Sequence, residues 1–362
     1  MGYLDNSRGP AYPLILKDLI LTPSLGAWFF SLASLSGLIV LLTSSKWLPV
    51  VGVVRGTKLS LIIMGLGSLF MGFIPYLEEQ YFFLLLFSVI FGIGQGLVSF
   101  CMNLLVAEAS TENTRGRAYS ALHCCYGVAS FVAPLVFSQF MEWKGSWSFF
   151  YLFMSAIPFL VFILVFKIGK GVVVSKEPPL KTNLSFKRRV VYGGVFSFYV
   201  ASEIVISTRL IYFLIEAKGI SSESAAQSLS FFFLSLMGGR LLFAFLPVKK
   251  KTYSFMIISL LSSMIIFYFG YTGDPRILAL LGGSMSFYFP MGMNWLSSRF
   301  EKGKEQMIAS VLTQVGVLLV LMHFFFGELA SGLGVEKALL MAPILLSISL
   351  LFLIILKKEE PS

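Results

Sequence analysis

The chain has 362 residues, of which 57% are hydrophobic and only 13% are charged, and its mean hydropathy is +0.84. Soluble globular proteins carry about 45–50% apolar and about 25% charged residues, so this composition excludes a soluble fold and indicates an integral membrane protein. The formal net charge of +10 does not indicate nucleic-acid binding, because that function needs a basic face on a soluble domain, for which the apolar segments leave no room.

Apolar runs separated by charged or turn residues predict eleven complete helical crossings, since a bilayer requires about 20 apolar residues per helix. In chain order, the predicted spans are 25–44, 59–76, 81–106, 118–140, 146–167, 190–214, 225–246, 252–271, 277–297, 306–328 and 338–356. Residues 1–16 are a shorter segment with two prolines, and we expect them to be the outer part of another span. A helix of that length covers only about 24 Å of a roughly 30 Å core. We therefore expect the first span to be incomplete at its N-terminus.

Lysines and arginines concentrate in every second connection, at 46–58, 115–117, 167–189, 249–251, 299–304 and 357–358. Because cytoplasmic loops retain an excess of basic residues, we place these connections and the C-terminus in the cytoplasm, and the protein in the plasma (inner) membrane. Residues 168–189 are the richest in basic residues and contain Pro178 and Pro179. They predict a cytoplasmic linker between an N-terminal half, 1–167, and a C-terminal half, 190–362. Contact with anionic lipids is an alternative interpretation of its charge.

The two predicted halves show weak similarity at an offset of 200 residues. Tyr12 aligns with Tyr212, and Thr22 aligns with Ser222. Thr22 and Ser222 each precede an apolar run, where a hydroxyl side chain can accept a hydrogen bond from the first free amides of a helix. Parallel repetition of six-helix halves is an architecture of transporters whose binding site lies between the halves.

Several segments carry a family resemblance. Residues 92–96 lead to Asn103 and are followed by 122–129, while 199–203 and 239–241 occur in the second half. Together they resemble the fourth, fifth, seventh and eighth spans of the major facilitator superfamily, and within it the fucose-permease-like sugar symporters. The resemblance covers essentially the whole chain. It implies an all-α membrane fold of two pseudo-symmetric six-helix halves that move a solute by alternating access.

The sequence departs from this family pattern in two places. The superfamily's loop between spans two and three usually carries an acid before a basic cluster, whereas this chain keeps Arg55 without the acid. We therefore expect other residues, Glu108 and Arg240, to form the ion pairs that close the cytoplasmic face. Proton-coupled sugar permeases of this branch carry an acid four residues before the asparagine of the fourth span, where this chain has Ser99, so proton coupling by that route is not expected.

Charged residues within predicted spans are the leading site candidates, because an ionised side chain at a helix centre costs about 2.5–3.5 kcal/mol on insertion scales. Glu203 is interpreted as a proton carrier or substrate contact, or alternatively as a structural partner of an arginine. Arg209 lies six residues further along on a different helix face, so we do not expect it to pair with Glu203. Asp5, Asn6 and Arg8 form the matching cluster in the first half, the alternative being an outer loop of solvated charges. We predict that Glu203 and at least one of Asp5 and Arg8 face one cavity between the halves.

Polar residues without charge extend this candidate site. Gln95, Ser99 and Asn103 recur every four residues and share one helix face, where they line a cavity or form hydrogen bonds between helices. Three further candidates are His123, Tyr126 and Gln314. His123 could titrate near neutral pH, although a packing role is the favoured alternative.

The sequence predicts neither a metal nor another cofactor, because its two histidines and three cysteines lack the spacing of a metal site. It also lacks a nucleophile elbow and a close pair of acids within a span, which argues against a membrane enzyme. We expect a monomeric secondary active transporter of a small polar solute, with a proton or sodium ion as the candidate coupling ion. The alternatives are an exporter of amphipathic compounds and a sensor or scaffold that does not transport.

Overall fold

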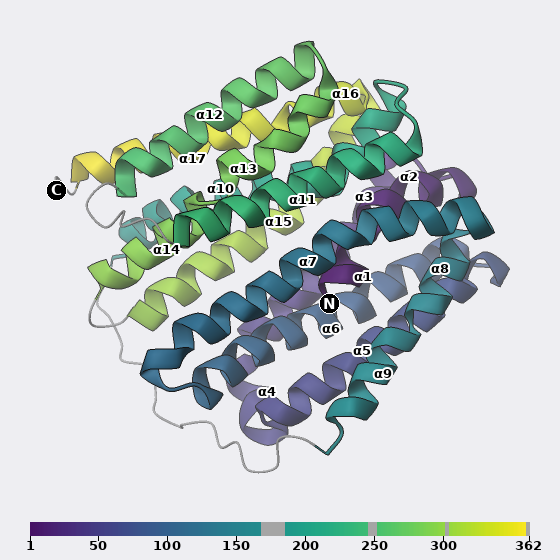
Figure 1. Cartoon of the computed structure of the whole chain (residues 1–362), viewed down its shortest axis with the longest axis horizontal. Coiled ribbons are helices and arrows are strands. Elements are labelled where there is room, and N and C mark those ends of the chain that lie inside the picture. Colours follow the sequence, from purple (N-terminus) through teal and green to yellow (C-terminus); the bar gives the residue numbers. More distant parts are fainter. Residues whose placement is uncertain (168–184, 245–251, 301–303, 360–362) are drawn as a thin grey trace.

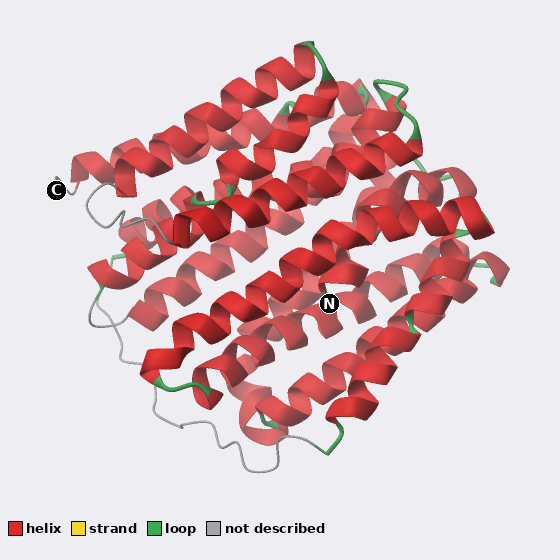
Figure 2. Cartoon of the chain, in the orientation of Figure 1, coloured by secondary structure: helices red, strands yellow, loops and turns green. Residues whose placement is uncertain are grey.

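The computed structural model describes residues 1–167, 185–244, 252–300 and 304–359 (Figure 1). Within these ranges the regular structure is helical, and no strand is present (Figure 2). Ten helical segments of the described chain are long and apolar enough to cross a membrane. The protein is therefore a multi-pass integral membrane protein, as its composition predicts.

The helices of residues 1–167, here the N-terminal half, agree with the predicted spans. Their bounds are α1 Gly2–Asn6, α2 Arg8–Asp18, α3 Pro23–Leu42, α4 Ser44–Val51, α5 Val53–Phe73, η1 Ile74–Tyr76, α6 Gln80–Ala109, α7 Glu112–Lys144, α8 Trp147–Met154 and α9 Ala156–Val165. The Thr22 side chain accepts a hydrogen bond from the backbone N–H of Leu25, and Pro23 occupies the first helical position of α3. Thr22 is therefore an N-cap residue, as predicted.

The helices of residues 185–359, here the C-terminal half, follow the same order. Their bounds are α10 Phe186–Glu216, α11 Ser222–Ala244, α12 Thr252–Thr272, η2 Pro275–Leu280, α13 Leu281–Met285, α14 Tyr288–Arg299, α15 Lys304–Leu333, α16 Val335–Leu339 and α17 Met341–Glu359. Helix α11 begins one residue earlier than the repeat predicts: Ser221, not Ser222, accepts a hydrogen bond from the N–H of Ser224. The predicted linker lies mostly outside the described residues, and α10 begins within it at Phe186.

The predicted span 277–297 is wrong as a continuous helix, because η2, α13 and α14 divide it. Gly282 and Gly283 weaken a helix in this segment, and Pro290 has no N–H with which to bond the carbonyl of Ser286, four residues earlier. Gly282 also packs so closely on α11 that an added Cβ would lie 2.0 Å from the carbonyl oxygen of Phe232. The break leaves backbone carbonyls at residues 285 and 286 for side chains from other helices.

Among the described residues, the main contacts between the two halves are those of α2 with α10, α3 with α15, and α7 with α11. One end of the molecule carries Ser24 and Ser331. We call it the outer end, because the basic-residue pattern predicts that it faces the outside. There the N–H of Ser24 donates to Ser331 Oγ at 2.7 Å, and its hydroxyl donates to Glu328. In Figure 1 the axes of α7 and α11 diverge toward the opposite end, which carries α4 and α14. The halves are thus in close contact at the outer end.

Candidate functional site

Asp5 lies at the centre of a polar cluster in the N-terminal half. Its Oδ1 atom is 2.5 Å from Nη2 of Arg8, one helical turn away, and its Oδ2 atom accepts hydrogen bonds from Gln95 Nε2 at 2.7 Å and from the Tyr126 hydroxyl at 3.0 Å. Asn6 donates to that same Tyr126 hydroxyl at 3.3 Å. We call Asp5, Asn6, Arg8, Gln95 and Tyr126 the N-terminal charge cluster. The predicted cluster of Asp5, Asn6 and Arg8 on α1 and α2 is thus joined by two separately predicted candidates, Gln95 from α6 and Tyr126 from α7.

The helix break at Ser7 positions this cluster. Ser7 separates α1 from α2, and its hydroxyl donates to the carbonyl of Leu4. On the far side of the break, the Arg8 guanidinium carbon lies 4.6 Å from the ring centre of Phe91 and 5.2 Å from that of Phe30. These rings shield Arg8 from water, and its side chain is only 8% exposed. Among the described residues, the carboxylate of Asp5 is its counter-charge. Asp5 and Arg8 are therefore not solvated charges of an outer loop.

Glu203 forms the corresponding cluster in the C-terminal half. Its Oε1 atom is 3.1 Å from Nη2 of Arg240 on α11, and its Oε2 atom is 2.8 Å from the Tyr199 hydroxyl, one turn earlier on α10. We call Tyr199, Glu203 and Arg240 the C-terminal charge cluster. The Glu203 side chain is 14% exposed and that of Arg240 is 36% exposed. The described partner of Arg240 is thus Glu203, and the predicted role of Arg240 in closing the cytoplasmic face stays a prediction.

The broken segment 277–297 supports the C-terminal charge cluster. The Ser286 carbonyl, which Pro290 leaves without a helical partner, accepts from Arg240 Nε at 3.4 Å. The Tyr199 hydroxyl also contacts the Met285 carbonyl, and its ring stacks on that of Tyr288 with centroids 4.1 Å apart. Backbone groups released by a proline and two glycines therefore fix the orientation of the side chains around Glu203.

Arg209 belongs to neither cluster, which agrees with the expectation that it does not pair with Glu203. It is fully buried, and its guanidinium carbon lies 4.4 Å from the ring centre of Tyr12, 4.1 Å from that of Phe30 and 5.0 Å from that of Phe326. None of its three nitrogens has a hydrogen-bond acceptor among the described residues. Because Tyr12 and Phe30 belong to one half and Phe326 to the other, Arg209 lies at the boundary between the halves.

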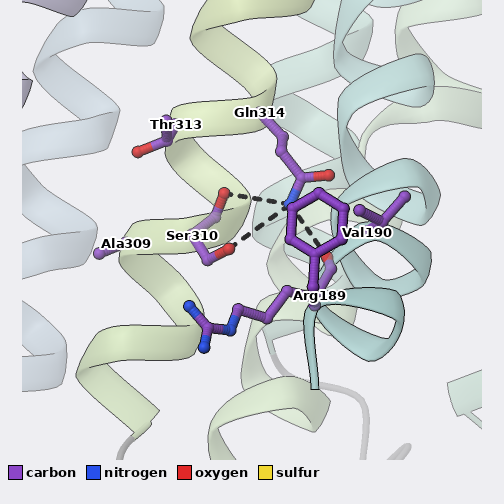
Figure 3. A pocket seen from close by; sticks show the side chains of 7 residues that line it. Arg189, Val190, Ala309, Ser310, Thr313 and Gln314 are labelled. Carbon is purple, nitrogen blue, oxygen red and sulfur yellow. Dashed lines mark hydrogen bonds between the residues drawn. The ribbon is translucent and has the colours of Figure 1, made fainter. Parts of the chain in front are cut away.

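The remaining polar candidates of α6 and α15 lie elsewhere. Ser99 is exposed, and its carbonyl accepts from Asn103 Nδ2 at 2.7 Å within the same helix. Gln314 lines a separate pocket of about 460 Å³ between the start of α10 and α15 (Figure 3). There its Nε2 atom donates to the carbonyl of Arg189 at 2.9 Å, over the close-packed Gly193. Gln314 is thus not brought to either charge cluster.

The predicted gating residues have different outcomes. Arg55 is exposed near the start of α5. The side chains of Glu108 and His123 lie outside the described residues, as does the 249–251 loop. Their predicted roles stay predictions.

Sequence reasoning missed several residues that the structure brings to the site. Tyr199 precedes Glu203 by four residues, so the shared helix face was a usable signal. Phe30 and Tyr288 gave no such signal, because an aromatic residue within an apolar span is ordinary. His323, which the sequence did not select, is 3% exposed and stacks on Phe30 with ring centroids 5.2 Å apart.

Comparison with known families agrees with this architecture. The profile of the Major Facilitator Superfamily matches residues 2–319. The chain belongs to the major facilitator superfamily. Within this superfamily, 174 residues are 28% identical to an uncharacterized MFS-type transporter, YfiU, of Bacillus subtilis (strain 168). That match covers 46% of this chain and 31% of the length of YfiU.

Solved structures of two transporters share the fold at low sequence identity. A D-xylose-proton symporter superposes with a TM-score of 0.79 at 14% identity, over 97% of this chain and 93% of its own. A bacterial homologue of the human lysosomal transporter Spinster, in an inward-facing and unoccupied conformation, gives a TM-score of 0.74 at 14% identity, over 100% and 96% of the two chains. These similarities establish the fold.

Proposed function

We propose that this protein is a secondary transporter that moves a small polar solute by alternating access between its two halves. One observation carries the proposal: each half holds a mostly buried carboxylate that is paired with an arginine and bonded to a tyrosine. Asp5 has Arg8 and Tyr126, and Glu203 has Arg240 and Tyr199. Such side chains are costly within a membrane and mark solute or ion pathways.

The C-terminal charge cluster is the candidate for ion coupling. Glu203 and Arg240 come from different helices, and Arg240 is exposed enough to exchange its partner for water or solute. Protonation of Glu203 would remove the charge that attracts Arg240, so a proton is the coupling ion that this geometry favours over sodium. We place the protein in the plasma membrane as a monomer with a cytoplasmic C-terminus, on the basis of the basic connections.

Uptake into proteoliposomes tests this function. Purified protein would be screened against sugars, amino acids, nucleosides, organic acids and dyes, with and without a proton or sodium gradient. We expect accumulation of at least one polar solute, and we expect Glu203→Gln to abolish its gradient-driven accumulation. Asp274→Asn, at an exposed carboxylate outside the spans, is the matched control.

Two outcomes would contradict the proposal. Transport of amphipathic dyes alone, without any polar solute, would instead favour the exporter. Full gradient-driven uptake by the combined Glu203→Gln and Asp5→Asn variant would show that neither carboxylate takes part.

A further inference from the structure

Arg209 is the one buried cation of the described spans that lacks a described counter-charge. Arg8 is paired with Asp5, and Arg240 is paired with Glu203, so those two pairs are each neutral. Arg209 is 0% exposed, and its Nε, Nη1 and Nη2 atoms have no acceptor among the described residues. The interaction of a guanidinium with aromatic rings compensates only part of the cost of burying a charge. Among the described arginines of the spans, Arg209 thus carries a buried positive charge that no carboxylate compensates.

Other unsatisfied polar atoms surround the same ring. Phe30 lies against Arg209 on one side, and the guanidinium carbon of Arg8 is 5.2 Å from the Phe30 ring centre. Nε of Arg8 and Nδ1 of His323, whose ring stacks on Phe30, are buried without a described hydrogen-bond partner. Groups from α2, α3, α10 and α15 therefore place three polar side chains with open bonding capacity around one phenyl ring at the boundary between the halves.

Opening of the outer end changes the surroundings of Arg209 directly. The rings of Tyr12 and Phe30 belong to the N-terminal half, whereas Arg209 and His323 belong to the C-terminal half. Separation of α2 and α3 from α10 and α15 removes those rings from the guanidinium. The guanidinium is then open to a planar anionic group, which it can bind through two parallel hydrogen bonds.

We infer that Arg209, with Arg8 and His323, recognises the carboxylate of an organic monoanion, and that this monoanion is the transported solute. The uncompensated positive charge of Arg209 matches a single negative charge, and the surrounding phenyl rings suit an apolar body on the solute. This inference rests on the proposed transport function and names its substrate class. A ligand that binds only after the outer end opens has a higher affinity for the state with this end open than for the state with it closed. Such a ligand therefore shifts the protein toward the open state.

Cysteine accessibility tests the inference with defined probes. Ser24→Cys would be introduced into full-length protein whose Cys101, Cys124 and Cys125 are replaced by serine, and labelled from outside with a membrane-impermeant maleimide. Ser24 reports opening because it bonds to Ser331 across the outer end. We expect sodium benzoate to raise the labelling rate at least threefold, and the neutral benzamide and sodium chloride to leave it unchanged.

Variants assign the effect to Arg209. Arg209→Gln should abolish the response to benzoate, whereas Arg209→Lys should retain part of it. Arg276→Gln, at an exposed arginine outside the spans, is the matched control and should retain all of it. An equal response of the parent protein to benzoate and benzamide, or to benzoate and chloride, would overturn the inference even if no Arg209 variant folds.

The proposed function and this inference fail in different ways. If proteoliposomes accumulate neutral solutes and no carboxylates, transport stands and the anionic substrate class is wrong. If no solute of any class is accumulated, the transport proposal itself is wrong.

Discussion

The two charge clusters place the same three groups, a carboxylate, an arginine and a tyrosine hydroxyl, in two different structural settings. In the N-terminal charge cluster, Asp5 and Arg8 are one turn apart beside a helix break, and the arginine is wrapped by phenyl rings. In the C-terminal charge cluster, Glu203 and Arg240 come from two long helices, and the arginine is 36% exposed. Burial and helix membership therefore make the first pair a fixed unit and leave the second pair free to separate.

Removal of Asp5 should have the largest effect on stability. In Asp5→Leu, Arg8 remains buried without its counter-charge, which typically costs about 3–5 kcal/mol in the free energy of unfolding. Denaturant titration in mixed micelles would measure this loss. The double variant Asp5→Leu, Arg8→Leu should recover much of it, because it no longer buries an unpaired charge. A double variant as unstable as Asp5→Leu alone would contradict this, because it would show that the unpaired charge of Arg8 is not what destabilises Asp5→Leu.

The equivalent change in the other half should cost less. In Glu203→Leu, Arg240 loses its partner but keeps contact with water, so we expect about 1–3 kcal/mol, the range for leaving one hydrogen-bonding group unpaired. The same titration would compare the two single variants directly. A loss for Glu203→Leu that equals or exceeds the loss for Asp5→Leu would remove the contrast between a fixed and a separable pair.

The smallest effect is expected at the exposed pair outside the spans. Hydrogen bonds from the Arg276 side chain, and then from its backbone N–H, hold the pKa of Asp274 below its ordinary value of 3.8. A lowered folded-state pKa stabilises the fold at pH values above the unfolded-state pKa, and this contribution disappears as the pH falls through the folded-state value. Solvent screens this pair. Thermal unfolding at neutral pH should therefore give Asp274→Asn the same melting temperature as the parent protein. A clearly lower melting temperature of Asp274→Asn at neutral pH would mean that this exposed ion pair stabilises the fold as much as the buried pairs do.

Most of the fold followed from hydropathy, because a helix that crosses lipid must be apolar over its whole length. Hydropathy measures composition, however, and it does not register the loss of a backbone hydrogen bond. The break within 277–297 was therefore missed, although Gly282, Gly283 and Pro290 were a usable signal.

The site could be predicted only where the charges themselves were the signal. Asp5, Arg8 and Glu203 stood out because charges are rare in apolar spans. The pairing of Glu203 with Arg240 could not be predicted, since spacing along one chain does not show which helices become neighbours. The isolation of Arg209 depends on how the two halves pack against each other, which no local pattern records.

The contact between α3 and α15 at the outer end has a consequence for electrical insulation. Gly327 packs there so closely that an added Cβ would lie 2.2 Å from that of Ala27 and 2.9 Å from the carbonyl oxygen of Pro23. At this point the two helices are too close for a water molecule to pass between them, and a chain of water molecules is what carries protons across a protein. A bulkier residue at this position would therefore wedge the two helices apart and let water and ions leak between them.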